Sequence, residues 1–248
     1  MEAANMNVGI IGTGEVGSAI KKIVERRYKV FSKDRKNDFI KGQKIEILHI
    51  CIPYSKDFIT IAVKAIRDYK PLLTIIESTV APGTTDKIHK QTKILICHSP
   101  IRGIHPNLYV GIKTFVKYIG PTSKKAGAKA QRYYEKLELK TEIFKNAKST
   151  EMAKLFDTAY YAWNIVFQKE LYKICQKEKV PVEEVYEKWN ETYNQGYTKL
   201  KKIKVVRPVL INCPGKIGGH CLIPNCKILE KSLLNPISKI VLNLNKKY

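Results

Sequence analysis

The sequence has no long apolar run and few cysteines for a chain of 248 residues. No stretch approaches the ~20 apolar residues that are needed to cross a bilayer. The opening residues, MEAANMNVGIIG, lack the basic region and the cleavage site of a secretory signal. Six scattered cysteines do not have the spacing of a disulfide framework. We therefore expect a cytoplasmic protein whose thiols stay reduced.

Acidic residues and arginine are also scarce. Lys and Arg total 45 against 22 Asp and Glu, which gives a formal net charge of +23, yet only 7 of the 45 are arginine. The lysines are spread along the whole chain, and arginine is the residue that makes planar bidentate contacts to phosphates. The composition therefore favours attraction of a small anionic ligand over nucleic-acid binding, and it indicates no membrane partner.

The first part of the chain alternates short β-branched runs with stretches of helical periodicity. The predicted strands are residues 7–11, 29–32, 46–52, 72–78, 94–99 and 115–120. The predicted helices are residues 15–27, 56–69 and 124–136. Strands that alternate with helices in this way predict an α/β domain with a doubly wound parallel sheet over residues 1–146.

Near residue 147 the pattern changes to helix alone. Residues 149–179 read as one long helix, with Ser149 as its N-cap, Glu151 in its first turn and Pro181 just beyond its end. Shorter helices are expected over 182–193 and 225–234, and Pro236 is expected to interrupt the second of them. There is no internal repeat and no low-complexity linker. We expect an all-helical domain over residues 147–248.

The segment GTGEVG places three glycines directly after the first predicted strand and at the start of a helix. In this G-x-G-x-x-G arrangement Gly12 permits a tight turn, Gly14 lets a pyrophosphate approach the backbone, and Gly17 lets helix and strand pack closely. The N-terminus of the helix then attracts the anion. This is the dinucleotide-binding turn of a Rossmann-type domain, and a plain glycine-rich turn is the alternative.

Asp34 lies at the end of the second predicted strand, 17 residues beyond Gly17. An acidic residue at about this distance (~20 residues) bonds the ribose hydroxyls of NAD. Lys33, Arg35 and Lys36 surround Asp34, so a solvated surface charge and an NADP site both remain open.

Six segments occur in a fixed order: GIIGTGEVG, CIPYS, ESTVAPGTT, HSPIRG, STEMAKLFDTAYYAWNIVFQKEL and GKIGGHCLIPN. With them the chain, from about residue 6 to 230, resembles the UDP-glucose/GDP-mannose (nucleotide-sugar) dehydrogenase family, UDP-N-acetylmannosamine dehydrogenases included. The family oxidises a sugar C6 alcohol to a carboxylate with two NAD, through a thioester on a cysteine. The resemblance thus implies NAD, an anionic nucleotide sugar as substrate, and a homodimer made by the helical domain. The family's second nucleotide-binding domain is expected to be missing.

The resemblance also implies roles for individual residues. Cys221 matches the nucleophile, Lys154 the lysine that stabilises developing oxyanions, and Thr79 the threonine beside the nicotinamide and the catalytic water. The cofactor-binding set that we expect is Gly12, Gly14, Glu15, Val16, Gly17, Asp34, Pro53 and Thr79.

Three positions depart from the family pattern. Ile101 stands in place of a glutamate, Thr158 in place of an asparagine, and Asn225 in place of an aspartate. Thr158 keeps a hydroxyl one helical turn from Lys154, so we retain it and Asn225 as candidate catalytic residues. Ile101 and Asn225 cannot act as bases. The groups for hydride transfer are therefore better preserved than those for thioester hydrolysis.

Several alternatives stay open. Cys221 is read as a nucleophile, but an inert buried thiol or a metal ligand together with Cys213, His220 and Cys226 would also fit, although the spacing lacks a C-x2-C pair and we predict no metal. Lys154 could be an ordinary surface lysine. The chain as a whole could be a catalytically degenerate NAD-binding dimer, or a two-domain hydroxyacid dehydrogenase that uses only the lysine.

Overall fold

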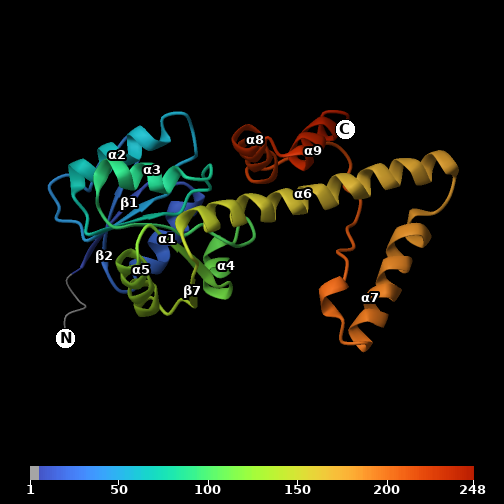
Figure 1. Ribbon diagram of the computed structural model, residues 1–248, viewed down its shortest axis with the longest axis horizontal. Coiled ribbons are helices and arrows are strands. Elements are labelled where there is room, and N and C mark those ends of the chain that lie inside the picture. Colours follow the sequence, from blue (N-terminus) through green and yellow to red (C-terminus); the bar gives the residue numbers. More distant parts are fainter. Residues whose placement is uncertain (1–5) are drawn as a thin grey trace. The chain divides into compact units, whose positions relative to one another are not determined.

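The computed structural model describes residues 6–248, which divide into two compact units, one up to Lys154 and the other from Leu155 to Tyr248 (Figure 1). The division falls inside helix α6 (Ala147–Glu178), whereas the sequence pattern changes where that helix begins. Among the described residues no helix is long and apolar enough to span a membrane.

The first unit is built on a seven-stranded sheet in the order β2-β1-β3-β4-β5-β6-β7. The strands are β1 (Asn7–Ile11), β2 (Lys29–Lys33), β3 (Ile47–Ile50), β4 (Leu73–Ile76), β5 (Ile96–His98), β6 (Lys117–Pro121) and β7 (Thr141–Ile143). All pairs are parallel except β5 and β6, so β6 and β7 run opposite to the other five. The predicted doubly wound α/β sheet is confirmed, with the correction that it is mostly rather than wholly parallel.

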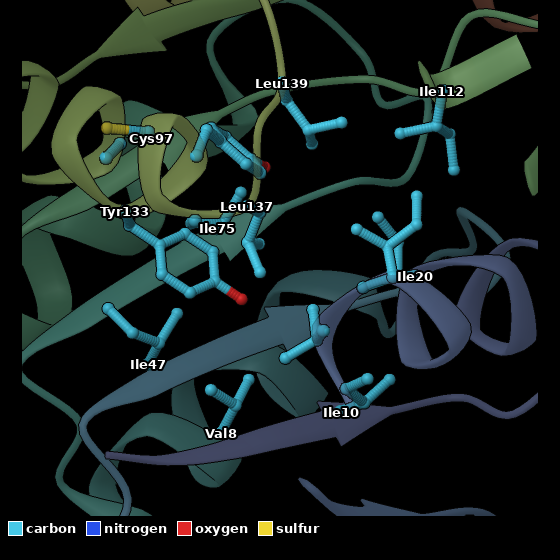
Figure 2. Close-up of a cluster of buried hydrophobic side chains, with 14 of the residues drawn as sticks. Val8, Ile10, Ile20, Ile47, Ile75, Cys97, Ile112, Tyr133, Leu137 and Leu139 are labelled. Carbon is cyan, nitrogen blue, oxygen red and sulfur yellow. The ribbon is translucent and has the colours of Figure 1, made fainter. Parts of the chain in front are cut away.

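Helices cover both faces of this sheet (Figure 1). One face carries α1 (Glu15–Val24), α4 (Leu108–Thr114) and α5 (Lys124–Lys136), and the other carries α2 (Phe58–Tyr69) and α3 (Thr84–Thr92). Figure 2 shows the first of the two resulting cores, in which Val8, Ile10 and Ile47 of the strands face Ile20 of α1 and Tyr133 of α5. Two buried faces explain why the strands are apolar throughout rather than alternating.

The second unit is helical. After α6 it contains a π-helical segment η1 (Glu183–Lys188), α7 (Trp189–Lys199), a 3-10 turn η2 (Ile203–Val205), α8 (Leu222–Leu233) and α9 (Pro236–Asn245). Its core joins Leu155, Ala162 and Val166 of α6 to Leu229 of α8 and Val241 of α9. The predicted helical part with one long helix is confirmed.

Two helix ends differ from the prediction. The side chain of Asn146, not Ser149, caps α6: its Oδ1 accepts from the backbone nitrogen of Ser149 at 2.9 Å. Pro236 does not interrupt a helix but lies in the first turn of α9, where Asn235 caps through its side chain. Proline suits that position because its missing N–H has no partner there in any case.

Candidate cofactor and catalytic site

The carboxyl ends of five strands meet at one edge of the sheet. In register, Ile11 pairs with Lys33 and Ile50, Ile50 pairs with Ile76, and Ile76 pairs with His98. The segments that follow these strands contain most of the residues that the sequence singles out. The sheet therefore places the glycine turn, Asp34, Pro53 and Thr79 along a single edge, which is where open α/β sheets bind ligands.

The glycine turn joins β1 to α1, and its three glycines meet different constraints. Gly12 has φ +91°, and a Cβ there would lie 2.6 Å from the carbonyl oxygen of Cys51. A Cβ on Gly17 would lie only 1.8 Å from the carbonyl oxygen of Gly12. A Cβ on Gly14 would meet nothing within 4 Å, and its φ of −67° suits any residue. The fold thus requires Gly12 and Gly17, but it does not require Gly14.

The N-terminus of α1 begins at Gly14 and has no side-chain cap. Its first backbone N–H groups and its dipole favour an anion. Open space at Gly14 together with an uncapped helix start fits the pyrophosphate of a dinucleotide, which would occupy the position that a side chain would otherwise fill.

Asp34 is exposed and lies beside this turn. Its Oδ2 accepts from the Thr13 hydroxyl at 3.2 Å, and its Oδ1 accepts from the backbone nitrogens of Lys36 and Asn37, both at 2.8 Å. These backbone hydrogen bonds lower the pKa of Asp34. The residue is therefore ionised at neutral pH, and it holds the loop after β2 in addition to any contact with a ligand.

Two further members of the predicted cofactor set take part in contacts within the chain. The Glu15 carboxylate lies 2.5 Å from Nδ1 of His105, which comes from the loop before α4. Val16 is partly buried and packs against the core beneath α1. For polar contacts with a ligand Val16 has only its backbone, whereas the side chain of Glu15 ties the start of α1 to that loop.

Pro53 and Thr79 follow neighbouring strands, β3 and β4. Pro53 is exposed and Thr79 is half-buried. Between them, the Ser78 hydroxyl donates to the carbonyl oxygen of Ile52 at 2.6 Å and lies 3.2 Å from that of Ile50. Ser78 thereby fixes the two loops to each other, a positioning role that the sequence analysis did not assign to it.

A buried charged cluster is built around Glu77, two residues before Thr79 in the sequence. Glu77, the first residue after β4, accepts hydrogen bonds from Lys117 through one oxygen and from Tyr134 (2.8 Å) through the other, which also lies 2.9 Å from Nδ1 of His49. Burial opposes ionisation of Glu77, but Lys117 and His49 outweigh it and lower its pKa to about 2. The sequence contains one signal for this cluster: an acidic residue directly after an apolar strand, as in LLTIIES.

Glu151 was also missed as a positioning residue. It is buried near the start of α6, yet it acts on the N-terminus of α3: its carboxylate accepts from the backbone nitrogens of Gly83 (2.5 Å) and Thr85 (2.8 Å) and from the Thr85 hydroxyl (2.6 Å). Glu151 thereby fixes the segment STVAPGTT, which contains Gly83 and Thr85. The sequence analysis placed Glu151 in the first turn of its own helix; α6 begins at Ala147, so Glu151 lies beyond that turn and stabilises the start of α3 instead.

Lys154 is half-buried at the end of the first unit. Burial lowers the pKa of His98 to about 3, and the positive charges of Lys117 and Lys154 contribute to this shift. His98 is therefore neutral, and it lies within hydrogen-bonding distance of the Thr150 hydroxyl (2.8 Å) and the carbonyl oxygen of Ser78 (3.1 Å). These contacts give His98 a structural role and place Lys154 within electrostatic reach of the carboxyl edge.

In the second unit, Cys221 occupies the N-cap position of α8 and is half-exposed. The helix begins at Leu222, so Pro224 lies within its first turn instead of preceding it. One turn further on, the buried Asn225 donates from Nδ2 to Oγ1 of Thr158 at 3.3 Å. Two of the three positions that depart from the family pattern are thus hydrogen-bond partners, and they tie the helix that starts at Cys221 to α6.

The third departing position, Ile101, is 6% exposed and belongs to the core that packs beneath α1 and α4. It follows β5 at the carboxyl edge, and it offers no group that could activate water. Within residues 6–248, no group of three or more His, Cys, Asp or Glu side chains is placed to hold a metal ion. Cys226, one of the ligands in the alternative metal reading, is fully buried in the helical core.

Comparison with known proteins supports the fold and the resemblance. No protein-family model matches the chain. The chain is 29% identical over 254 residues to the UDP-N-acetyl-D-mannosamine dehydrogenase of Methanocaldococcus jannaschii, covering 90% of this chain and 56% of that protein. The structure of UDP-D-ManNAc dehydrogenase from Pyrococcus horikoshii superposes with a TM-score of 0.82 at 20% identity, covering 98% of this chain and 68% of that one.

A Mycobacterium tuberculosis 3-hydroxyisobutyrate dehydrogenase also shares the fold, with a TM-score of 0.73 at 12% identity over 98% of this chain and 93% of that one. The chain spans about half the length of the curated relatives that it matches. The resemblance that the sequence motifs indicate is nevertheless confirmed: over most of its length this chain is similar in sequence to nucleotide-sugar dehydrogenases.

Proposed function

We propose that the chain is an NAD-dependent dehydrogenase that oxidises the alcohol of a nucleotide sugar, with UDP-N-acetylmannosamine as the first candidate because the relatives named above act on it. The observation that carries the proposal is Gly14: it lies at an uncapped helix start, and nothing among residues 6–248 requires it to be glycine. Binding of a pyrophosphate at this position would explain why the residue is glycine.

We propose NAD rather than NADP as the cofactor. Asp34 is ionised and lies beside the glycine turn, where its free lone pairs suit a ribose hydroxyl and its charge repels a 2′-phosphate. The residues present therefore fit NAD, with its pyrophosphate at Gly12–Gly17, its ribose at Asp34, and Pro53 and Thr79 along the same edge. When bound, NAD supplies the hydride acceptor.

The chemistry that the chain's own residues would perform follows from the resemblance. Lys154 assists loss of the alcohol proton through a bound water. Transfer of a hydride from the alcohol carbon to NAD, as the proton leaves, gives the aldehyde. The Cys221 sulfur, as the thiolate, then adds to the aldehyde carbon while the carbonyl oxygen takes up a proton. Loss of that proton, with transfer of a hydride to a second NAD, leaves a thioester on Cys221, and water hydrolyses it to the carboxylate with release of the Cys221 thiol. The position of Cys221 at the N-terminus of α8 supports this role, because a helix start favours a negative charge.

Hydrolysis of the thioester is the step with the weakest support from the chain. Ile101 is packed in the core, and the amide of Asn225 donates to Thr158. Neither position holds a base. These two observations favour a second candidate, a cofactor-binding protein with little or no turnover. The hydroxyacid dehydrogenase alternative, which needs only Lys154, is consistent with the two-unit layout.

Assembly and location complete the proposal. The part of α6 in the second unit buries Leu155, Ala159 and Val166 while Tyr160 and Phe167 are 61% and 54% exposed. Such unpartnered aromatic surface supports a homodimer formed through this helix. The scattered spacing of the six cysteines supports a cytoplasmic protein with reduced thiols.

One assay separates the candidate functions: reduction of NAD by the purified chain with a panel of nucleotide sugars and hydroxy acids. Reduction with a nucleotide sugar that yields the carboxylate in the wild type, but no carboxylate in Cys221→Ala, supports the main proposal. Reduction with a hydroxy acid that is unchanged in Cys221→Ala but lost in Lys154→Ala assigns the two-electron alternative. Binding of NAD without any reduction assigns the degenerate protein.

A further inference from the structure

A second edge of the sheet carries a feature that the proposed function does not use. A groove of about 360 Å³ opens at the amino ends of β1 and β3, where Met6 and Ile47 line it. The cofactor edge is formed by the carboxyl ends of the same strands. A five-residue strand is about 16 Å long, so the groove and the glycine turn are separated by the length of a strand.

One side of the groove is a row of positive charges on α5. Lys125, Lys129, Arg132 and Lys136 all line it, at intervals of four, three and four residues that place them on one face of the helix. The row extends over about 16 Å at the helical rise. Within residues 6–248 none of these four side chains forms an ion pair.

The mutual repulsion of these charges affects the pKa of Lys129, at the centre of the row. Burial lowers the pKa of Lys129, and the positive charges of Lys125 and Arg132 lower it further. Glu46 is the acidic group that acts in the opposite direction, but one of its carboxylate oxygens already accepts from the backbone nitrogen of Asn7 at 2.7 Å. The chain therefore leaves an excess of positive charge at this groove.

Tyr28 supplies an independent observation at the same place. It lines the groove, is 5% exposed, and stacks on Tyr133 with ring centroids 5.8 Å apart. Its hydroxyl is buried, and the neighbouring Arg27, which acts on it through its charge and a side-chain hydrogen bond, can only donate; no described residue accepts the hydroxyl proton. A buried hydroxyl whose proton has no acceptor is unfavourable, so it indicates a missing acceptor.

We propose that this groove binds an oligophosphate, a chain of two or three phosphates that is either free or carried by a nucleotide. Four cations in a row match an extended anion with several charges better than a single phosphate. Three of them are lysines, which contact phosphates as point charges. The Tyr28 hydroxyl would donate to a phosphate oxygen. The site is separate from the cofactor edge, and it does not depend on the proposed dehydrogenase activity.

The test is isothermal titration of the full chain with inorganic tripolyphosphate, and in a second arm with a nucleoside triphosphate. Lys125→Glu/Lys129→Glu should weaken binding by about tenfold or more, since two charge-assisted contacts become repulsive. The matched control is Lys87→Glu/Lys90→Glu, which reverses two exposed charges on α3, on the other face of the sheet, and should bind as the wild type does. Saturating NAD should leave the titration unchanged.

Tyr28→Phe gives a second readout. It should weaken tripolyphosphate binding by roughly threefold or more, as one hydrogen bond is lost, while thermal unfolding without ligand occurs at the same or a higher temperature. If the charge-reversed variant does not fold, Lys125→Gln/Lys129→Gln replaces it. Equal binding by wild type and groove variants, or displacement of tripolyphosphate by NAD, overturns the proposal. Tighter binding of a DNA oligonucleotide than of either phosphate probe, through the same lysines, overturns it in favour of nucleic acid.

Discussion

Substitution of Gly14 by alanine should separate cofactor binding from folding. A Cβ at this position meets no atom within 4 Å, and the backbone φ of −67° is open to alanine. Alanine is a poorer N-cap than glycine by about 0.5 kcal/mol. It also lowers the conformational entropy of the unfolded chain, which stabilises the fold by a similar amount, about 0.4–1 kcal/mol. The free energy of unfolding should therefore change by less than about 0.5 kcal/mol. NAD affinity should fall by about tenfold or more, because the methyl group occupies the space of the pyrophosphate.

Gly17→Ala is the matched control from the same turn. Its Cβ would lie 1.8 Å from the carbonyl oxygen and 2.9 Å from the carbonyl carbon of Gly12, so α1 must move away from β1. Strain of this kind costs about 1–3 kcal/mol. At about 2–4 °C per kcal/mol, a cost of 2 kcal/mol lowers the unfolding temperature by about 4–8 °C. Gly17→Ala should thus lose both stability and NAD binding.

The assay combines thermal unfolding followed by circular dichroism with calorimetric titration of NAD. Wild-type affinity for NAD in Gly14→Ala would show that no pyrophosphate approaches this residue. A loss of stability in Gly14→Ala equal to that in Gly17→Ala would show that the fold itself requires the glycine. Either result refutes the reasoning from the open space at Gly14.

Three further predictions concern the buried charges, the cysteine and assembly. Glu77→Gln should lower the free energy of unfolding, measured in urea, by about 3–5 kcal/mol, because Lys117 stays buried without its counter-charge. The double variant Glu77→Gln/Lys117→Met should recover part of this lost stability. Since the pKa of Glu77 is lowered from 4.5 to about 2, its contribution to stability is present above pH 4.5 and should disappear as the pH falls towards 2. A productive nucleotide sugar with NAD should leave a slowly hydrolysed acyl adduct in intact-mass spectra that is absent in Cys221→Ala, whereas unchanged turnover in that variant excludes the nucleophile. Sedimentation should show a dimer at micromolar concentration that Tyr160→Lys/Phe167→Lys dissociates; a wild-type monomer would contradict assembly through α6.

The sequence predicted the parts of the fold that local pattern encodes. Apolar strands, the glycine turn and the long α6 each carry their signal within one stretch of residues. β7 and α3 were missed because TEI and TTDKIHKQT contain few apolar residues. The N-terminus of α3 is instead stabilised by Glu151, which is 66 residues away from Thr85. The reversed direction of β6 likewise depends on its pairing with β5 and not on its own sequence.

The candidate site also has one part that local motifs predict and another that depends on contacts between distant residues. The motifs placed Gly12, Asp34, Pro53 and Thr79 on loops after successive strands, and the strand register brings those loops to one edge. The buried Glu77–Lys117 pair joins residues 40 positions apart, and the Asn225–Thr158 hydrogen bond joins residues 67 apart. Sequence comparison marked Thr158 and Asn225 as separate departures from the family. Their direct contact is a tertiary property that neither position shows alone.

Transfer of an isotope label tests the central claim, that the chain moves hydride from a nucleotide sugar to NAD. Nucleotide sugars that carry deuterium at carbon 6 are incubated with NAD and the full chain, and the dinucleotide is then analysed by mass spectrometry. The account predicts reduced NAD that contains deuterium, and none when Lys154→Ala replaces the wild type. No reduction of NAD with any nucleotide sugar, or reduced NAD without the label, would contradict it.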